Sequence, residues 1–149
     1  MGYKNVVVGT DGSETAERAV ADAAELAAAS GARLIVVTAF TPAHDHEAGA
    51  RAQAAPDDIR WMLADRNQAE EKARHGRELA KAAGAGDVVV QTADGDPSDV
   101  LLAAAEDFGA DLIVVGSKGL TGASRFILGS VASGVSHHAP CDVLVVHTA

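Results

Sequence analysis

Five short runs of β-branched and aliphatic residues, separated by longer amphipathic segments, most constrain the fold of this chain. The runs are Asn5–Val8, Leu34–Thr38, Val88–Gln91, Leu112–Val115 and Val143–Val146. They are continuously apolar rather than alternating, which is typical of parallel strands covered on both faces. Because helical segments fall between them, the order of elements predicts a parallel, right-handed, doubly wound α/β sheet between helical layers.

The segments between the runs carry helix-end signals. Ser13 is placed to cap a helix that stops at Gly31, and Asp96 precedes a proline at the first position of another helix. The predicted helices are 13–30, 58–83, 97–108 and about 130–137. Residues 41–57 are Ala-rich and irregular, and we expect a loop there.

Composition narrows the class of protein. The 149 residues suit one domain, 1–149, whose core is Ala, Val and Leu because aromatic residues make up only 3%. A net charge of −9 argues against nucleic acid or an anionic membrane as a main partner, since both require clustered Lys and Arg. The single cysteine, Cys141, excludes an internal disulfide, and no apolar stretch approaches the roughly 20 residues of a membrane span. We therefore expect a cytoplasmic protein.

A glycine-dense segment follows the fourth apolar run. Gly116–Ser130 reads GSKGLTGASRFILGS, with glycines at 116, 119, 122 and 129. Without Cβ atoms in the way, backbone N–H groups can converge on an anion, and a helix that starts at the far end adds partial positive charge. The segment predicts a phosphate site.

A second polar turn, Gly9–Ser13, follows the first run. Ligands of open α/β sheets bind at the carboxyl ends of strands, where the winding reverses. If both turns line one crevice, the first and fourth strands are neighbours. This predicts a five-stranded sheet of strand order 3-2-1-4-5.

At these residues the chain resembles the nucleotide-binding branch of the universal stress proteins. Gly116, Gly119, Gly129 and Ser130 match the spacing Gly-x2-Gly-x9-Gly-(Ser/Thr) of that branch. The opening VVVGTDGS, which contains Asp11, and the closing CDVLVVHT are also similar to the family. The resemblance covers nearly the whole chain and implies a Rossmann-like, adenine nucleotide alpha hydrolase-like fold.

The resemblance also implies how each part of the site meets a ligand. Residues at the adenine and ribose end would be Gly9, Thr10, Asp11 and Ala39. Residues around the ribose and phosphates would be Gly116, Ser117, Lys118, Gly119, Gly129, Ser130 and Val131. Asp11 could instead stabilise only its own turn, the glycines could serve only tight turns, and Lys118 could be an ordinary solvated charge.

The implied ligand is ATP, with or without Mg²⁺, held by a stress-response sensor or regulator. Cyclic AMP is the competing ligand. The chain lacks a Gly-x4-Gly-Lys-(Ser/Thr) loop and an evident water-activating base, so we nominate no catalytic residue and expect at most slow hydrolysis. A slow ATPase and an interaction module with an empty pocket remain alternatives. His44 and His46 lack a matched second cluster, so we predict no metal site made by the protein alone.

The last predicted strand, Asp142–His147, would lie at a sheet edge. An apolar, unprotected edge invites pairing with another chain. The resemblance implies a homodimer through this strand, and the alternative is an edge covered by the chain's own loops. The sequence does not identify a regulatory protein partner.

Overall fold

The computed structural model describes residues 2–40, 55–117 and 129–148. Within them, five strands form one parallel sheet of order β3-β2-β1-β4-β5, which confirms the predicted fold. The strands are β1 (Asn5–Gly9), β2 (Arg33–Phe40), β3 (Asp87–Asp94), β4 (Leu112–Gly116) and β5 (Asp142–Val146). The helices are α1 (Glu14–Ser30), α3 (Ala55–Ala82), α4 (Pro97–Phe108) and α5 (Ser130–His138).

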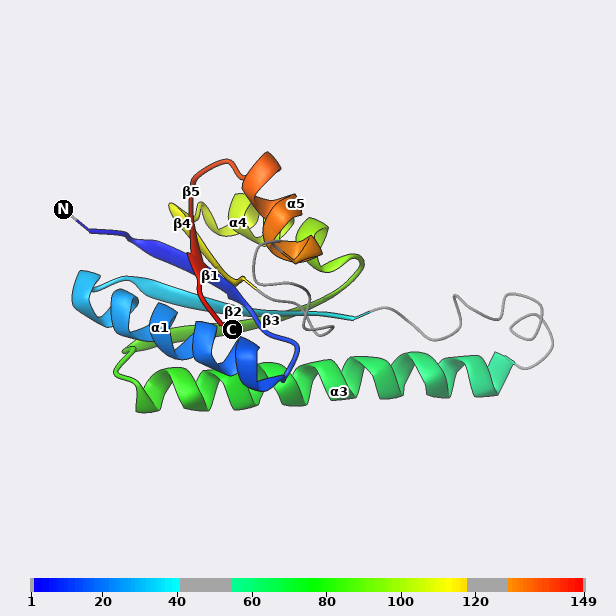
Figure 1. Ribbon diagram of the computed structural model, residues 1–149. Helices are drawn as coiled ribbons and strands as arrows, with labels where there is room; N and C mark the ends of the chain where they lie inside the picture. Colours follow the sequence, from blue (N-terminus) through cyan, green and yellow to red (C-terminus); the bar gives the residue numbers. More distant parts are fainter. Residues whose placement is uncertain (1, 41–54, 118–128, 149) are drawn as a thin grey trace.

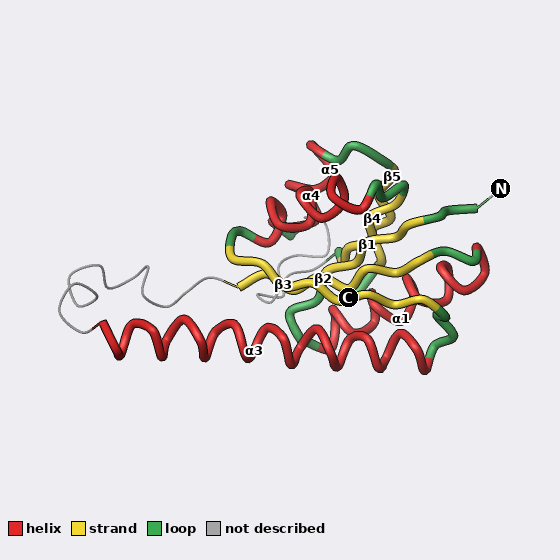
Figure 2. Tube along the Cα trace, turned by 180° about the vertical axis from the view of Figure 1, so that it is seen from behind, coloured by secondary structure: helices red, strands yellow, loops and turns green. Residues whose placement is uncertain are grey.

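The helices cover the sheet on both faces, with α1 and α3 on one side and α4 and α5 on the other (Figure 1). Figure 2 shows the same three layers from behind. Successive strand residues point to opposite faces, so Leu34 and Val36 pack toward α1 and α3, while Ile35 and Val37 pack toward α4 and α5. Two separate cores therefore need apolar residues at every position of a central strand.

The predicted helix ends are confirmed at three positions. The Ser13 hydroxyl accepts a hydrogen bond from the Ala16 N–H at 3.2 Å, and an Asp96 carboxylate oxygen accepts one from the Ser98 N–H at 3.1 Å. Gly31 has a φ of 70°, a left-handed conformation that ends α1 and favours glycine. Each cap satisfies backbone groups that the helix itself leaves unpaired.

Helix α3, the second of the described helices, begins earlier than expected. It starts at Ala55 rather than Asp58, and Pro56 lies in its first turn, where a missing N–H has no helical partner to lose. The N-terminal part of this 28-residue helix extends past the sheet in both views (Figures 1 and 2). The rest of the predicted loop, residues 41–54, lies outside the described residues.

The two edge strands are less buried than the three central ones. All residues of β3 are partly or fully exposed, and β5 alternates between exposed and partly buried positions until Val146. The predicted edge position of β5 is confirmed, and its Leu144 is 40% exposed. A continuously apolar run thus did not distinguish an edge strand from a central one.

A carboxylate fixes the start of β1 beside β4. Asp111 accepts hydrogen bonds from the N–H groups of Lys4, at 2.9 and 3.1 Å, and of Asn5, at 3.0 Å. Burial raises the pKa of Asp111, but these backbone donors outweigh it and hold the pKa below its ordinary value. The contact aligns the two strands whose far ends form the site.

Candidate functional site

A pocket lies at the carboxyl ends of β1, β2 and β4, where the winding of the sheet reverses. It contains about 730 Å³ of space between atoms, part of it open to solvent. The two turns that the sequence suggested, after the first and fourth strands, both reach it.

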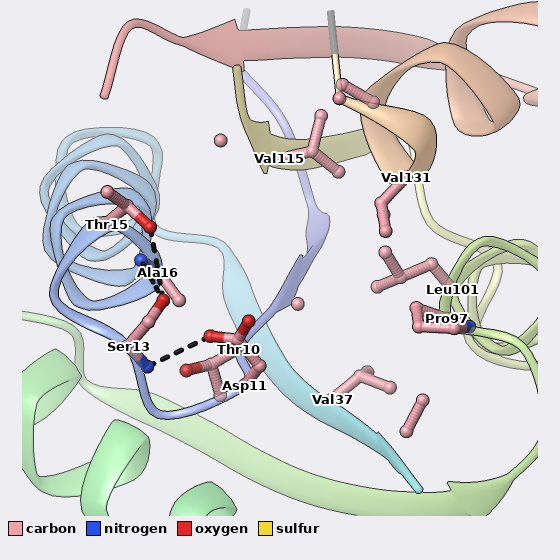
Figure 3. A pocket seen from close by; sticks show the side chains of 15 residues that line it. Thr10, Asp11, Ser13, Thr15, Ala16, Val37, Pro97, Leu101, Val115 and Val131 are labelled. Atoms are coloured by element: carbon pink, nitrogen blue, oxygen red, sulfur yellow. Dashed lines mark hydrogen bonds between the residues drawn. The ribbon is translucent and has the colours of Figure 1, made fainter. Parts of the chain in front are cut away.

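One side of the pocket is polar and the other apolar (Figure 3). The polar side comes from the turn after β1 and the start of α1, with Thr10, Asp11, Ser13 and Thr15. The apolar side comes from β2, α4 and α5, with Val37, Pro97, Leu101 and Val131. Among the described lining residues, Asp11 carries the only charged side chain. The pocket therefore suits a ligand with a flat apolar part and a hydroxylated part.

Hydrogen bonds hold the polar turn in place. The Thr10 hydroxyl accepts from the Gly12 N–H at 3.1 Å, and the Asp11 Oδ1 atom accepts from the Ser13 N–H at 2.9 Å. Gly12 has a φ of 83°, a conformation that L side chains rarely adopt. Asp11 thus stabilises its own turn and also lines the pocket, so the two roles considered for it are compatible.

The end of β2 presents backbone groups to the pocket. The Val37 carbonyl points toward β1, since it accepts from the Thr10 N–H at 2.9 Å. In a parallel strand every second residue directs both its N–H and its C=O to the same side. Ala39 therefore faces the β1 side as Val37 does, but the β1 ladder stops at Gly9. Ala39 lies opposite Ala93 of β3, but its own N–H and C=O point away from β3. They are therefore left for a ligand, and Ala39 lines the pocket.

Glycine brings the apolar wall close to the strand ends. A Cβ atom on Gly9 would lie 3.0 Å from Cδ1 and 3.1 Å from Cδ2 of Leu101. This is tighter than ordinary contact, so the Leu101 side chain rests against the bare backbone of β1. A larger residue at position 9 would push this wall into the pocket.

The start of α5 forms the opposite end of the pocket. Gly129 is its N-cap residue and makes no side-chain cap bond, while Val131 and Ala132 in the first turn line the pocket. First-turn N–H groups have no partner within a helix, and they carry partial positive charge. The Gly129 N–H already donates to the Ser117 carbonyl oxygen at 2.9 Å. The donors left for an anion are therefore those of Ser130, Val131 and Ala132.

The structure brings most of the predicted residues together. The pocket is lined by Gly9, Thr10, Asp11, Ala39, Gly116, Gly129 and Val131. Ser117 and Ser130 are adjacent to lining residues but do not line it, and the Ser117 hydroxyl accepts a hydrogen bond from the Thr148 N–H at 3.1 Å. Lys118 and Gly119, with the rest of 118–128, lie outside the described residues.

Sequence reasoning missed several lining residues. They are Ser13, Thr15, Ala16, Val37, Pro97, Leu101, Val115 and Ala132. One signal could have found Pro97 and Leu101: in a parallel sheet each helix starts near the carboxyl end of the strand before it. The start of α4 therefore had to lie at the same sheet edge as the two polar turns.

Cys141 does not line the pocket, and the described residues hold no cluster of metal ligands. In the part of the chain that the structure describes, no group of three or more His, Cys, Asp or Glu side chains could hold a metal ion, and His44 and His46 lie outside that part. Cys141 is partly buried, and burial, followed by the charges of Asp142 and Asp111, raises the pKa of its thiol. A raised pKa opposes a nucleophilic role for this cysteine at neutral pH.

The described helices include none long and apolar enough to cross a membrane.

Known proteins match the chain along its whole length. The model of the universal stress protein family matches residues 2–147. The universal stress protein Rv1636 of Mycobacterium tuberculosis is 41% identical over 146 residues, which cover 98% of this chain and 97% of the relative.

Two solved structures of similar fold contain a nucleotide. A universal stress protein in complex with cAMP superposes with a TM-score of 0.74 at 38% identity, covering 100% of both chains. The universal stress protein of Archaeoglobus fulgidus in complex with dAMP has a TM-score of 0.67 at 27% identity, covering 97% of this chain and 98% of that one. With its sheet order, its pocket and these matches, the chain belongs to the universal stress protein family.

Proposed function

We propose that this protein binds an adenine nucleotide in the pocket at the ends of β1, β2 and β4, and that the bound nucleotide regulates its contacts with other proteins. The proposal rests on one observation: two groups that can bind a nucleotide lie at opposite ends of the same pocket. Backbone groups of Ala39 face it from β2, and the uncapped start of α5 faces it from the other end. Relatives in complex with cAMP and dAMP support this reading.

The base would lie on the apolar side, against Val37, Pro97 and Leu101. Adenine presents an acceptor at N1 beside a donor at N6, and one backbone N–H with its neighbouring C=O complements that pair. Guanine presents the opposite pattern at these positions. With the base oriented so that N1 faces the Ala39 N–H and N6 faces its C=O, Ala39 would favour adenine over guanine. The ribose would meet the hydroxyls and carboxylate of Thr10, Asp11 and Thr15, and Gly116 would lie beneath it.

The phosphates would lie at the start of α5. The donors are the N–H groups of Ser130, Val131 and Ala132, with the Ser130 hydroxyl and the predicted Lys118 and Gly119 nearby in sequence. Gly129 contributes by leaving room beside the phosphate rather than by donating, because its N–H already bonds to Ser117. A phosphate held mainly by uncharged amides is compatible with a chain of net charge −9.

ATP is our first ligand and cyclic AMP the second. The Gly116–Ser130 segment spans enough glycines for more than one phosphate, which favours ATP, and Mg²⁺ would arrive with the nucleotide. A solved relative of 38% identity is in complex with cAMP, which favours the second. Asp11 is the only carboxylate among the described lining residues, and it belongs to the ribose side, so we expect little or no hydrolysis.

The proposal includes a homodimer formed through the edge strand β5, whose exposed Leu144 would lie in the interface. It also includes a reducing, cytoplasmic setting, consistent with the free thiol of Cys141.

Substitution at Val131 tests the phosphate end of the pocket. Val131→Asp removes a partly buried apolar side chain but places a carboxylate in the first turn of α5, where the helix dipole favours it and offsets part of the lost packing. The same charge repels a phosphate. Val131→Thr has a similar shape and no charge, and it serves as the matched control.

Isothermal titration of both variants and the wild type with ATP, cyclic AMP, adenosine and GTP gives the readout. We expect the wild type to bind ATP or cyclic AMP and to discriminate against GTP. Val131→Asp should weaken ATP binding by more than about tenfold, roughly 1.4 kcal/mol, yet leave adenosine binding nearly unchanged. Absence of nucleotide binding by the wild type, or an equal loss for adenosine and ATP, would contradict the proposal.

A further inference from the structure

Ser117 makes hydrogen bonds from three of its groups to two distant parts of the chain. Its N–H donates to the Val146 carbonyl oxygen at 2.8 Å, and its hydroxyl oxygen accepts from the Thr148 N–H at 3.1 Å. Its carbonyl oxygen accepts from the Gly129 N–H at 2.9 Å. One residue therefore holds both the chain after β5 and the residue that begins α5.

The neighbours of Ser117 in these contacts belong to the pocket. Gly116, which precedes it, lines the pocket, and so does Gly129, to which it is bonded. Ser117 itself does not line the pocket, and its side chain instead contacts the chain after β5. There Thr148 is only 3% exposed, and Val146, also buried, is the last β5 residue in register with β4.

Ser117 thus lies between a ligand site and the C-terminal end of the edge strand. A phosphate at the start of α5 would orient the first turn, whose Ser133 N–H bonds back to the Gly129 carbonyl at 2.9 Å. The Gly129 N–H lies next to this first turn of α5 and donates to the Ser117 carbonyl oxygen. Ordering the turn therefore also orders Ser117. The Ser117 N–H and C=O belong to two planar peptide units that meet at its Cα atom, so the two backbone bonds are linked through the φ and ψ angles of one residue.

Resting on the proposed function, we infer that Ser117 is a positioning residue that couples nucleotide binding to the C-terminal segment after β5. Occupancy of the pocket stabilises the Ser117–Thr148 hydrogen bond, and that bond in turn stabilises the occupied pocket. Coupling between two sites is reciprocal, so each should change the other by the same factor. The consequence is that the nucleotide state reaches the sheet edge at which another chain would pair.

Amide hydrogen exchange at Thr148, followed by NMR on the full chain, tests the first half of the coupling. In the wild type, saturating ATP or cyclic AMP should slow exchange of the Thr148 N–H by about two- to tenfold, the equivalent of one net hydrogen bond. Ser117→Ala removes the hydroxyl acceptor and should abolish the difference between free and bound protein. Ser117→Thr keeps the acceptor and should retain it.

Nucleotide affinity tests the second half. Thr148→Pro removes the donor N–H at a position outside the pocket. The variant should bind nucleotide more weakly than the wild type, by the same factor by which nucleotide slows exchange of the Thr148 N–H in the wild type. Since Ser117→Ala and Thr148→Pro break the same bond, the double variant should bind no more weakly than the weaker single variant. The comparison of Thr148→Pro with the wild type does not depend on whether Ser117→Ala folds.

Two failures are distinguishable. If the wild type binds nucleotide but Thr148 exchange is unaffected, or if the two substitutions are additive in affinity, the coupling is overturned and the nucleotide site stands. If the wild type binds neither ATP nor cyclic AMP, the proposed function fails, and the coupling fails with it.

Discussion

The N–H group of Thr10 donates a hydrogen bond of 2.9 Å to the carbonyl oxygen of Val37, at the point where the ladder between β1 and β2 ends. Beyond this bond the chain turns away from the sheet into α1, while β2 continues to Phe40 beside β3. The side of β2 that β1 leaves uncovered is where the pocket opens. The same bond fixes the direction of the Ala39 backbone groups.

Removing the Ala39 N–H should weaken adenine binding selectively. Ala39→Pro lacks this N–H, and the β2–β3 ladder does not use it, because it faces the β1 side. We expect affinity for ATP or cyclic AMP to fall by about tenfold or more, while circular dichroism and the unfolding midpoint change little. Ala39→Gly retains the N–H and should bind nearly as the wild type does. Equal affinities of the Pro and Gly variants would show that Ala39 does not read the base.

A glycine in α3 allows that helix to approach the sheet. A Cβ atom on Gly76 would lie 2.9 Å from Cγ1 of Val36, a buried residue of β2. Ala favours a helix by about 1 kcal/mol over Gly, but overpacking a core costs about 1–3 kcal/mol. We expect Gly76→Ala to lower the free energy of unfolding by about 1 kcal/mol in urea titrations.

Two variants check this prediction. Gly86→Ala meets nothing within 4 Å and should be nearly neutral. Val36→Ala opens space for the new methyl group, so the double variant with Gly76→Ala should lose less stability than the sum of the single losses. A stabilised Gly76→Ala protein would mean that α3 shifts away from β2 without cost.

Stability should depend on pH through Asp111. Since the pKa of Asp111 is lowered in the folded protein, its contribution is present above the unfolded-state pKa of about 3.9 and is lost as pH falls through the lower folded-state value. Asp111→Asn should cost about 1–2 kcal/mol at pH 7, from weaker acceptance of the Lys4 and Asn5 N–H groups. In urea titrations the difference in the free energy of unfolding between wild type and variant should become smaller below about pH 4. A difference that stays constant from pH 7 to pH 3 would rule out this linkage.

Charge at the β5 edge should prevent the proposed dimer. Leu144 is 40% exposed on an edge strand, and a lysine at an edge opposes pairing with another chain. We expect sedimentation velocity to show a dimer for the wild type at micromolar concentration and a monomer for Leu144→Lys. Ala103→Lys adds the same charge at an exposed position of α4 and should remain dimeric. A monomeric wild type would remove the dimer from the proposal.

The sequence predicted the fold well because its signals are local. Each helix end is marked by contacts between residues a few positions apart. The structure contains the predicted caps: Ser13 and Gly31 at the two ends of α1, and Asp96 before Pro97 at the start of α4. The site was predicted only in part, because a pocket is made of residues distant in sequence. Pro97 and Leu101 look like ordinary helix residues until the fold places both in the wall of the pocket, with Leu101 against Gly9.

By itself the sequence determined the alternation of strands and helices, their caps, and the two polar turns that had to meet at one sheet edge. It did so because periodicity and capping act between near neighbours. Only the tertiary structure decided how exposed the residues of the edge strands β3 and β5 are, how the Ala39 backbone groups are directed, and that Ser117 bonds to Thr148 and Gly129. Those relationships depend on which strands lie side by side and where each one ends, and no local pattern contains that information.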